Sequence, residues 1–237
     1  MLTDRRDEAL PQGDEKAAAV RSMFDTIAPR YDLVNRIMTF RLDVGWRRRA
    51  VRMLGLAPGS VVVDVACGTG DLCLDLAGDG LRPVGVDFSW GMLRAGLDRV
   101  GATPLVQGDA QRLPFGDASV DGVVSGFALR NFVDLRTFLG ECGRVVRPGG
   151  RLALLEVATP PSPLMRAGHA VYFGRVVPLI GGLVSGNGAA YRYLPRSVSY
   201  LPDVDELLDL VRGAGFATVQ RHLLSGGIAQ LLTGTRS

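Results

Sequence analysis

The sequence predicts an α/β fold in which helices cover both faces of a doubly wound, mixed β-sheet. Residues 60–65 form a β-branched run that leads through a glycine-rich turn into leucines at helical spacing. Short apolar runs then alternate with helical patterns as far as residue 157, which is typical of parallel strands joined by helices. Two apolar runs at 216–224 and 228–235 predict a terminal hairpin, which makes the sheet mixed.

The segment before the first strand reads as a helical cap. We expect residues 1–13 to be a loose tail, residues 14–57 to form the cap and residues 58–237 to form the main domain. Helices that precede such a core can lie across the open edge of the sheet. The cap residues singled out are a stripe of Leu33, Ile37 and Phe40, Phe24 and Trp46 as core, and Tyr31 and Asn35 as polar groups facing a ligand.

The main domain continues with regular elements and one insertion. A Pro-rich break begins an apolar, Gly-rich insertion at about residues 159–195. Strands are expected at 82–88, 103–107, 121–126 and 151–157, and helices at 71–77, 135–146 and 203–214. With the first strand and the hairpin, these make seven strands.

The glycine-rich turn, Gly68-Thr69-Gly70, is the candidate ligand site. Glycines let the chain turn sharply and let a ligand approach the backbone at the carboxyl end of a strand. A dinucleotide site would need a third glycine three residues after Gly70, which is missing here. Asp64 and Asp71 flank the turn and suit a cation that carries an ammonium and a sulfonium group. S-adenosylmethionine is such a ligand, although the two acids alone would also fit a simple capping role.

Acidic residues at the ends of the next two strands favour an adenosine ligand. Asp87 lies about 20 residues beyond the turn, where an acid accepts both ribose hydroxyls in dinucleotide enzymes and methyltransferases alike. Asp109 follows the third strand and can accept from the adenine amino group, although a turn role is the alternative. Arg130 and Asn131 follow the fourth strand, whose end faces the reactive part of the cofactor in folds of this kind.

Composition excludes several classes of protein. A net charge of +3 with dispersed arginines and a single lysine, Lys16, gives no support for a nucleic-acid site. The three cysteines are wrongly spaced for zinc, so we expect no metal, and their odd number favours a reducing cytosol. The longest apolar run, at 176–184, is too short to span a bilayer, so we expect a cytoplasmic protein that can lie on a membrane surface.

Longer motifs resemble a known family. The runs Phe24-Asp-Thr-Ile-Ala-Pro-Arg-Tyr-Asp-Leu-Val-Asn35, Leu129-Arg-Asn131 and Arg144-Val-Val-Arg-Pro-Gly-Gly150 are similar to those of the ubiquinone/menaquinone biosynthesis C-methyltransferases. The demethylmenaquinone methyltransferase branch is the most similar. The resemblance implies a Rossmann-like class I methyltransferase fold and S-adenosylmethionine as cofactor. It implies cofactor contacts at Thr69, Asp87, Asp109 and Ala110, with Gly126 where family members often carry a serine.

The resemblance also implies the reaction, a methyl transfer to a ring carbon of a prenylated quinol. Arg130 can stabilise the quinol oxyanion, while Tyr31 and Asn131 can hold its hydroxyl. His169, in the insertion, is a candidate base or a structural residue, and His222 reads as structural. The apolar insertion can receive the prenyl tail, form a homodimer face or belong to the core, and a lipid substrate favours peripheral contact with the inner face of the cell membrane.

Two other classes of protein remain open at this point. One is a methyltransferase that acts on another aromatic or polyketide small molecule. The other is a dinucleotide-binding oxidoreductase or a non-catalytic adenosine-binding module, because the motif of strand, glycine turn and acid is shared with those proteins.

Overall fold

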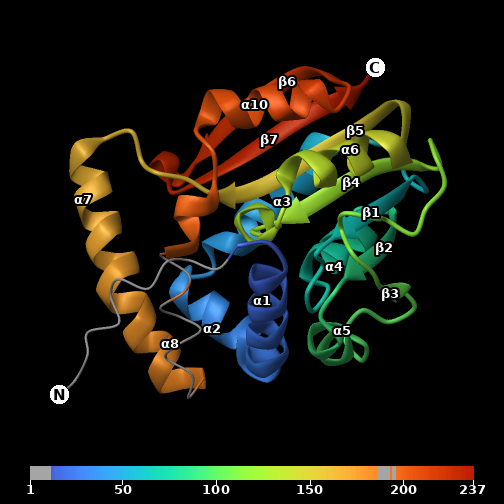
Figure 1. Cartoon of the computed structure of the whole chain (residues 1–237). Helices are drawn as coiled ribbons and strands as arrows, with labels where there is room; N and C mark the ends of the chain where they lie inside the picture. The colour runs from blue at the N-terminus through green and yellow to red at the C-terminus, as the bar shows by residue number, and fades with distance from the viewer. Residues whose placement is uncertain (1–11, 186–192, 194–195) are drawn as a thin grey trace.

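The structure, a computed structural model, describes residues 12–185, 193 and 196–237, and contains one seven-stranded sheet in the order β3-β2-β1-β4-β5-β7-β6 (Figure 1). All neighbouring strands are parallel except the pairs that involve β7. The predicted mixed, doubly wound sheet is therefore confirmed. The strands are β1 (Val61–Val65), β2 (Arg82–Asp87), β3 (Leu105–Gln107), β4 (Val120–Gly126), β5 (Val146–Val157), β6 (Phe216–Leu224) and β7 (Ala229–Arg236).

Helices cover both faces of the sheet, and the alternation of side chains along β1 explains how. Val63 and Val65 face the core beneath α6 (Leu135–Val145) and α10 (Val204–Gly213). Val62 faces the opposite core, beneath α3 (Leu42–Leu54) and α4 (Asp71–Gly78). Asp64 has the same parity as Val62, so its side chain lies on the face that α4 covers, where Cys73 approaches it.

The cap comprises α1 (Gly13–Ile27), the short turn η2 (Ala28–Arg30), α2 (Tyr31–Met38) and α3. The predicted stripe on α2 was wrong, because Leu33, Ile37 and Phe40 are exposed. Val34 and Met38 are buried instead, since they share the face that packs against Val177. Apolar residues at helical spacing occur on both faces of α2, and only packing against a later helix selects between them.

A helical arm formed by the predicted insertion lies beside the cap (Figure 1). It runs through α7 (Pro163–Val171), the π-helix η4 (Tyr172–Val176) and α8 (Val177–Ser185). The Tyr172 hydroxyl donates to the carbonyl oxygen of Met38 at 2.7 Å and so joins the arm to α2. The rest of the insertion, residues 186–192 and 194–195, and residues 1–11 of the predicted tail lie outside the described residues.

The only lysine of the chain fastens α1 to the loop after β4. Lys16 is buried, and its Nζ donates to the carbonyl oxygen of Phe132 at 2.6 Å. The same ammonium lies 3.7 Å from the ring centroid of Tyr200, which follows the arm in the sequence. One side chain therefore links the cap to two distant segments.

Gly96, near the end of α5 (Trp90–Gly96), allows this helix to lie against the glycine-rich turn. A Cβ atom there would be 2.8 Å from the carbonyl oxygen of Thr69. Gly96→Ala is therefore expected to destabilise the fold by about 2 kcal/mol and to weaken cofactor binding, because backbone must move. Thermal unfolding and calorimetric titration with S-adenosylmethionine measure both effects.

Gly140→Ala is the matched control. Gly140 lies within α6 and a Cβ there would meet nothing within 4 Å, so alanine is expected to stabilise the helix by up to about 1 kcal/mol. Equal unfolding temperatures for the two variants would contradict the tight packing of α5 on the turn.

Candidate active site

The glycine-rich turn begins where β1 ends and closes on Asp87 at the end of β2. Gly68 has a φ of +56° and Gly70 a φ of +83°, a region that L side chains rarely adopt. The Gly68 N–H donates to Asp87 Oδ2 at 2.8 Å, and the Ser89 N–H donates to Oδ1 at 2.8 Å. Burial raises the pKa of Asp87 to about 6, while these two donors act in the opposite direction. The acid is thus held rigidly beside the turn.

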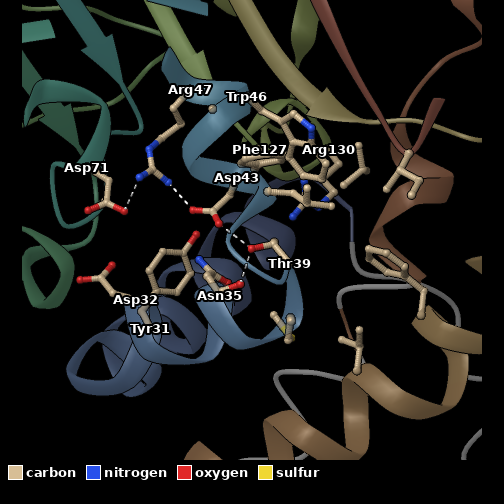
Figure 2. Close-up of a pocket in the computed structure, with 18 of the residues that line it drawn as sticks. Tyr31, Asp32, Asn35, Thr39, Asp43, Trp46, Arg47, Asp71, Phe127 and Arg130 are labelled. Atoms are coloured by element: carbon tan, nitrogen blue, oxygen red, sulfur yellow. Dashed lines mark hydrogen bonds and ion pairs between the residues drawn. The ribbon is translucent and has the colours of Figure 1, made fainter. Parts of the chain in front are cut away.

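A cavity of about 440 Å³ lies between the turn, the cap and the helical arm. Its polar end is lined by Asp64, Gly68 and Thr69, and its other end by apolar side chains of the cap and the arm. This volume falls in the range of small-molecule sites, which combine apolar walls with a few fixed polar groups. Figure 2 shows Tyr31 and Asn35 projecting from α2 on the side of Asp43, and Trp46 of α3 beside Phe127.

A second, smaller cavity of about 70 Å³ adjoins the same turn. Asp87, Asp109 and Ala110 line it, and Ala66 lines both cavities. A ligand that passes Ala66 would place one end beside Asp109 and the other beside Asp64. All of the expected cofactor residues except Gly70 therefore line one or the other of two cavities that share Ala66.

Two of the glycines singled out in the sequence differ in their placement. Gly126 lines the larger cavity, where a Cβ would be 3.0 Å from Leu72 Cδ1. Gly70 lines neither cavity. A Cβ there would be 2.3 Å from Val100 Cγ1, so a glycine is needed at this position for the turn to pack against Val100. Ser125, one residue before Gly126, donates its hydroxyl to the carbonyl oxygen of Val65 at 2.8 Å and is engaged within the sheet.

Asp64 is an acid of this site with a carboxylate oxygen that makes no hydrogen bond to the described residues. The side chain is buried, and its Oδ1 has no hydrogen-bond partner among the described residues. Burial raises the pKa of Asp64 to about 8, because a carboxylate loses its hydration there. A cation bound in the cavity would restore the charged form, so this carboxyl group fits the cationic end of S-adenosylmethionine.

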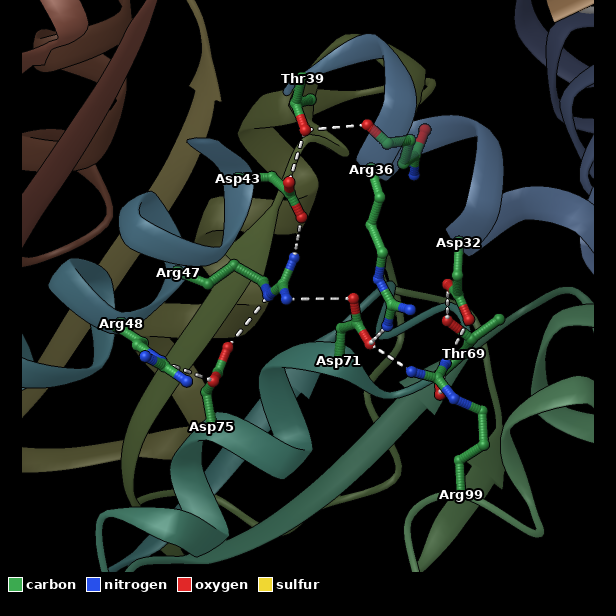
Figure 3. Close-up of polar contacts among 11 residues, drawn as sticks. Asp32, Arg36, Thr39, Asp43, Arg47, Arg48, Thr69, Asp71, Asp75 and Arg99 are labelled. Carbon is green, nitrogen blue, oxygen red and sulfur yellow. Dashed lines mark hydrogen bonds and ion pairs between the residues drawn. The ribbon is translucent and has the colours of Figure 1, made fainter. Parts of the chain in front are cut away.

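Asp71 behaves differently, which corrects the expectation that both acids offer negative charge to the ligand. Its carboxylate pairs with Arg47 at 3.1 Å, with Arg99 at 2.5 Å and with Arg36 at 3.8 Å (Figure 3). The sequence separates these arginines from Asp71 by up to 35 residues, so the pairing could not be seen there. Asp71 therefore ties the cap to α4.

The same network reaches the turn itself (Figure 3). Asp32 of α2 accepts a hydrogen bond from Thr69 Oγ1 at 2.6 Å and also pairs with Arg99. Arg47 Nε pairs with Asp75 at 3.0 Å, one helical turn after Asp71. Cap and turn are thereby held in one arrangement by partly buried ion pairs.

Arg130 lies in the short helix η3 (Leu129–Asn131) and lines the larger cavity. It is buried and forms an ion pair with Glu156, a fully buried acid on β5. The Nε of Arg130 has no hydrogen-bond partner among the described residues. Sequence reasoning missed Glu156, although an acid within the apolar run Leu152-Ala-Leu-Leu-Glu-Val157 signals a buried charge that needs a partner.

Arg130 and Asn131 face different cavities, although both were expected beside the reacting methyl group. Asn131 lines the smaller cavity, and its Oδ1 accepts a hydrogen bond from the Tyr193 hydroxyl at 3.2 Å. Successive residues of a 3₁₀ turn point about 120° apart, which explains the divergence. The structure thus places Asn131 on the side of Asp109 and Ala110.

Tyr31 lines the larger cavity from the cap side. Its ring makes an edge contact with Phe24 at a centroid distance of 5.9 Å, and Asn35 follows one helical turn later on α2. Burial raises the pKa of the Tyr31 hydroxyl, so this group remains a proton donor at neutral pH. Trp46, expected as core, is buried and donates Nε1 to Ser225 Oγ at 2.9 Å.

No group of three or more potential metal ligands occurs among the residues that the structure describes. Within the same residues, none of the helices has the length and apolar character that crossing a bilayer requires.

Solved structures share this fold at low sequence identity. Haemonchus contortus phosphoethanolamine N-methyltransferase 2 in complex with S-adenosyl-L-methionine matches with a TM-score of 0.60 and 15% identity, over 80% of this chain and 52% of that chain. The [4+2]-cyclase SpnF matches with a TM-score of 0.66 and 17% identity, over 97% of each chain. Since a cyclase shares the architecture, the fold alone does not define the reaction.

Fold, glycine turn and acids together define a Rossmann-like class I methyltransferase that uses S-adenosylmethionine. The ubiE/COQ5 methyltransferase family matches residues 12–236, and the chain belongs to that family. The chain is 44% identical to demethylmenaquinone methyltransferase of Roseiflexus castenholzii, over 96% of this chain and 97% of the relative. It is 43% identical to the ubiquinone/menaquinone biosynthesis C-methyltransferase UbiE of Syntrophotalea carbinolica, over 92% and 94%. The dinucleotide and non-catalytic alternatives are therefore set aside.

Asp64→Asn is expected to lower the affinity for S-adenosylmethionine about 10- to 100-fold, because it removes the charge that a bound cation restores. Calorimetric titration at pH 8 measures this loss. The same variant is expected to stabilise the ligand-free protein. The pKa of Asp64 is raised from 3.8 to about 8, so folding opposes its ionisation, and the advantage of asparagine grows from about pH 4 to about pH 8.

Asp71→Asn is the control, because its expected effect on the stability of the ligand-free protein is opposite to that of Asp64→Asn. It leaves Arg47 and Arg99 with one partner fewer, so it is expected to lower the unfolding temperature, and to do so less at high salt. An unchanged cofactor affinity in Asp64→Asn would refute the assignment of Asp64.

Proposed function

We propose that this protein transfers a methyl group from S-adenosylmethionine to a ring carbon of demethylmenaquinol and so forms menaquinol. Membership of the ubiE/COQ5 family and the names of its relatives support a quinol substrate. The observation that carries the proposal is the buried Arg130, whose Nε is unpartnered among the described residues and which lines an apolar cavity beside the cofactor turn. A quinol ring carries the hydroxyl that such a group can meet.

Four residues have separate roles in the proposed methyl transfer. When bound, S-adenosylmethionine supplies a methyl group on a cationic sulfur, which needs no further activation. Asp64 holds the cationic end, and Asp87 accepts the ribose hydroxyls beside the turn. Arg130 stabilises the oxyanion that makes the neighbouring ring carbon nucleophilic, and Tyr31 donates to the quinol oxygen. The ion pair with Glu156 fixes the guanidinium in place.

The apolar end of the cavity suits the prenyl tail. Met38 on α2 and Tyr172, Phe173 and Val177 on the arm line it. Burying the tail there contributes free energy in proportion to the apolar area removed from water. A methyltransferase for another aromatic compound would have no need of this space, so the acceptor assay includes a tail-less naphthol.

Arg130→Lys is expected to lower kcat with demethylmenaquinol about 100-fold, because an ammonium cannot keep both Glu156 and the quinol oxygen. Affinity for S-adenosylmethionine should change less than twofold. Labelled S-adenosylmethionine with demethylmenaquinol, a demethylated benzoquinol and a tail-less naphthol as acceptors measures both the rate and the preference.

Arg136→Lys serves as the matched control, because Arg136 is an exposed arginine on the neighbouring helix α6. The proposal fails if the unmodified protein methylates only the tail-less naphthol. The role of Arg130 fails if both lysine variants retain the full rate.

We also propose that the helical arm contacts anionic lipid. Leu164, Val171 and Leu179 on the arm are exposed, at 83%, 55% and 63%. Residues 157–202 contain no aspartate or glutamate but four arginines, so the segment combines apolar side chains with positive charge. The exposed Phe40 and Leu42 lie at the end of α2 and the start of α3, and Phe40 packs on Tyr172 of the arm.

The double variant Leu164→Asp with Val171→Asp is expected to lower binding to phosphatidylglycerol vesicles at least tenfold, since it replaces apolar area by charge on one face of α7. Sedimentation with vesicles measures binding. Leu223→Asp, an exposed residue on β6, is the control and should bind as the unmodified protein does. If light scattering shows that the double variant loses a dimer that the unmodified protein forms, while vesicle binding is unchanged, this surface would instead be a homodimer interface.

A further inference from the structure

Three buried side-chain atoms of the described residues lack a hydrogen-bond partner, and all three belong to residues that line the larger cavity. They are Asp64 Oδ1, Arg130 Nε and His169 Nε2. Buried polar atoms are normally satisfied, so unsatisfied ones gathered at one cavity indicate where ligand groups bind. The proposed function uses the first two atoms and leaves His169 without a role.

His169 lies near the end of α7, directly before the π-helix η4. Its ring packs against that of Phe173 of η4 at a centroid distance of 4.4 Å, with the two planes tilted by 37°. A π-helix inside a longer helix is costly and occurs frequently at functional sites. The Tyr172 hydroxyl of the same π-helix is hydrogen-bonded to α2, which joins the segment next to His169 to the cap.

The proposed reaction needs a proton acceptor for the quinol hydroxyl, and the polar residues that were already expected to meet the cofactor or the quinol do not suit that task. Arg130 carries a guanidinium, which stays protonated, and the raised pKa of Tyr31 keeps its hydroxyl protonated. Asp64 lies at the cofactor end, beside the turn. Asn131 faces the smaller cavity.

We propose that His169 is a catalytic residue of this methyltransferase and takes the proton of the quinol hydroxyl at Nε2. The inference rests on the proposed function, because it assigns a role within the same cavity. The ligand class is a phenolic hydroxyl beside the ring carbon that is methylated.

The step balances as follows. The quinol O–H bond breaks, its proton passes to His169 Nε2, and the oxygen pair raises electron density at the adjacent ring carbon. That carbon forms a bond to the methyl group, and the methyl–sulfur bond breaks with its pair remaining on sulfur. The ring carbon then loses its own hydrogen to water, the ring regains aromaticity, and His169 returns its proton to the oxygen. One proton is released overall.

The surroundings keep His169 in the form that accepts a proton. Burial lowers the pKa of His169 below 6.5, so the imidazole is neutral at pH 7. Ionisable groups lining the same cavity are Tyr31 and Asp32 on α2, Asp43 and Arg47 on α3, Asp64 on β1 and Arg130 on η3. Cys67 of the turn, Asp71 on α4 and Tyr172 on η4 complete them. Asp32, Asp43 and Asp71 are paired with arginines, whereas burial raises the pKa of Asp64, at the cofactor end, to about 8.

The chain has two histidines, which gives a matched pair of variants. His169→Gln is expected to lower kcat with demethylmenaquinol about 100-fold, whereas His222→Gln on β6 should leave it within twofold. His169→Phe keeps an aromatic ring for packing against Phe173 and should lose as much activity as glutamine. Calorimetry with S-adenosylmethionine shows that each variant is folded, since its affinity should be unchanged.

Two measurements separate a proton acceptor from a structural residue. In the unmodified protein kcat should rise with pH through a pKa below 6.5 and then level off. In His169→Gln this pH-dependent rise of kcat should be absent. Added imidazole should raise the activity of His169→Ala at least tenfold. The rescued rate should depend on the basicity of the imidazole when substituted imidazoles are used.

Proton NMR gives a readout that is independent of turnover. With the His222→Gln variant, the single remaining imidazole resonance should change its titration when S-adenosylhomocysteine and menaquinol are added together. A full rate in His169→Gln, an unchanged pH limb, or no rescue by imidazole would overturn the role of His169. No methylation of any quinol by the unmodified protein would overturn the proposed function instead.

Discussion

The ion pairs of Asp71 hold the cap in position over the glycine-rich turn. Arg36, Arg47 and Arg99 come from a cap helix, the next cap helix and the segment after α5, and they converge on this single carboxylate. Pairs that are only partly exposed are screened less than surface pairs, and a network fixes more geometry than isolated contacts. The larger cavity has the cap as one wall, so its shape depends on this network.

Much of the cofactor side could be predicted from sequence because the determinants are local. The turn from β1 to α4 and the acid at the end of β2 follow from strand and helix periodicity with a few glycines. Asp87, for example, reaches the turn because parallel neighbours end at the same edge of the sheet. These arguments need no knowledge of distant contacts.

Most of the features that escaped prediction depend on long-range packing. Asp71 looked like a ligand for a cation because its arginine partners are remote in sequence. Leu33 and Ile37 had the right spacing for a core, but Val34 and Met38 meet the arm instead. Arg130 and Asn131 are adjacent and equally polar, and only the 3₁₀ turn separates their directions. Glu156 was hidden because strand patterns predict burial without naming a partner.

The link made by Lys16 has a practical consequence for the cap. Burial lowers the pKa of this amine to about 8, so a large share of it is uncharged and nucleophilic in mildly alkaline buffer. No other side chain of the protein carries an amine, yet this one is covered by Phe132 and Tyr200. An acylating reagent would have to displace these contacts before it could react with the amine, so slow labelling of Lys16 would report that α1 stays docked.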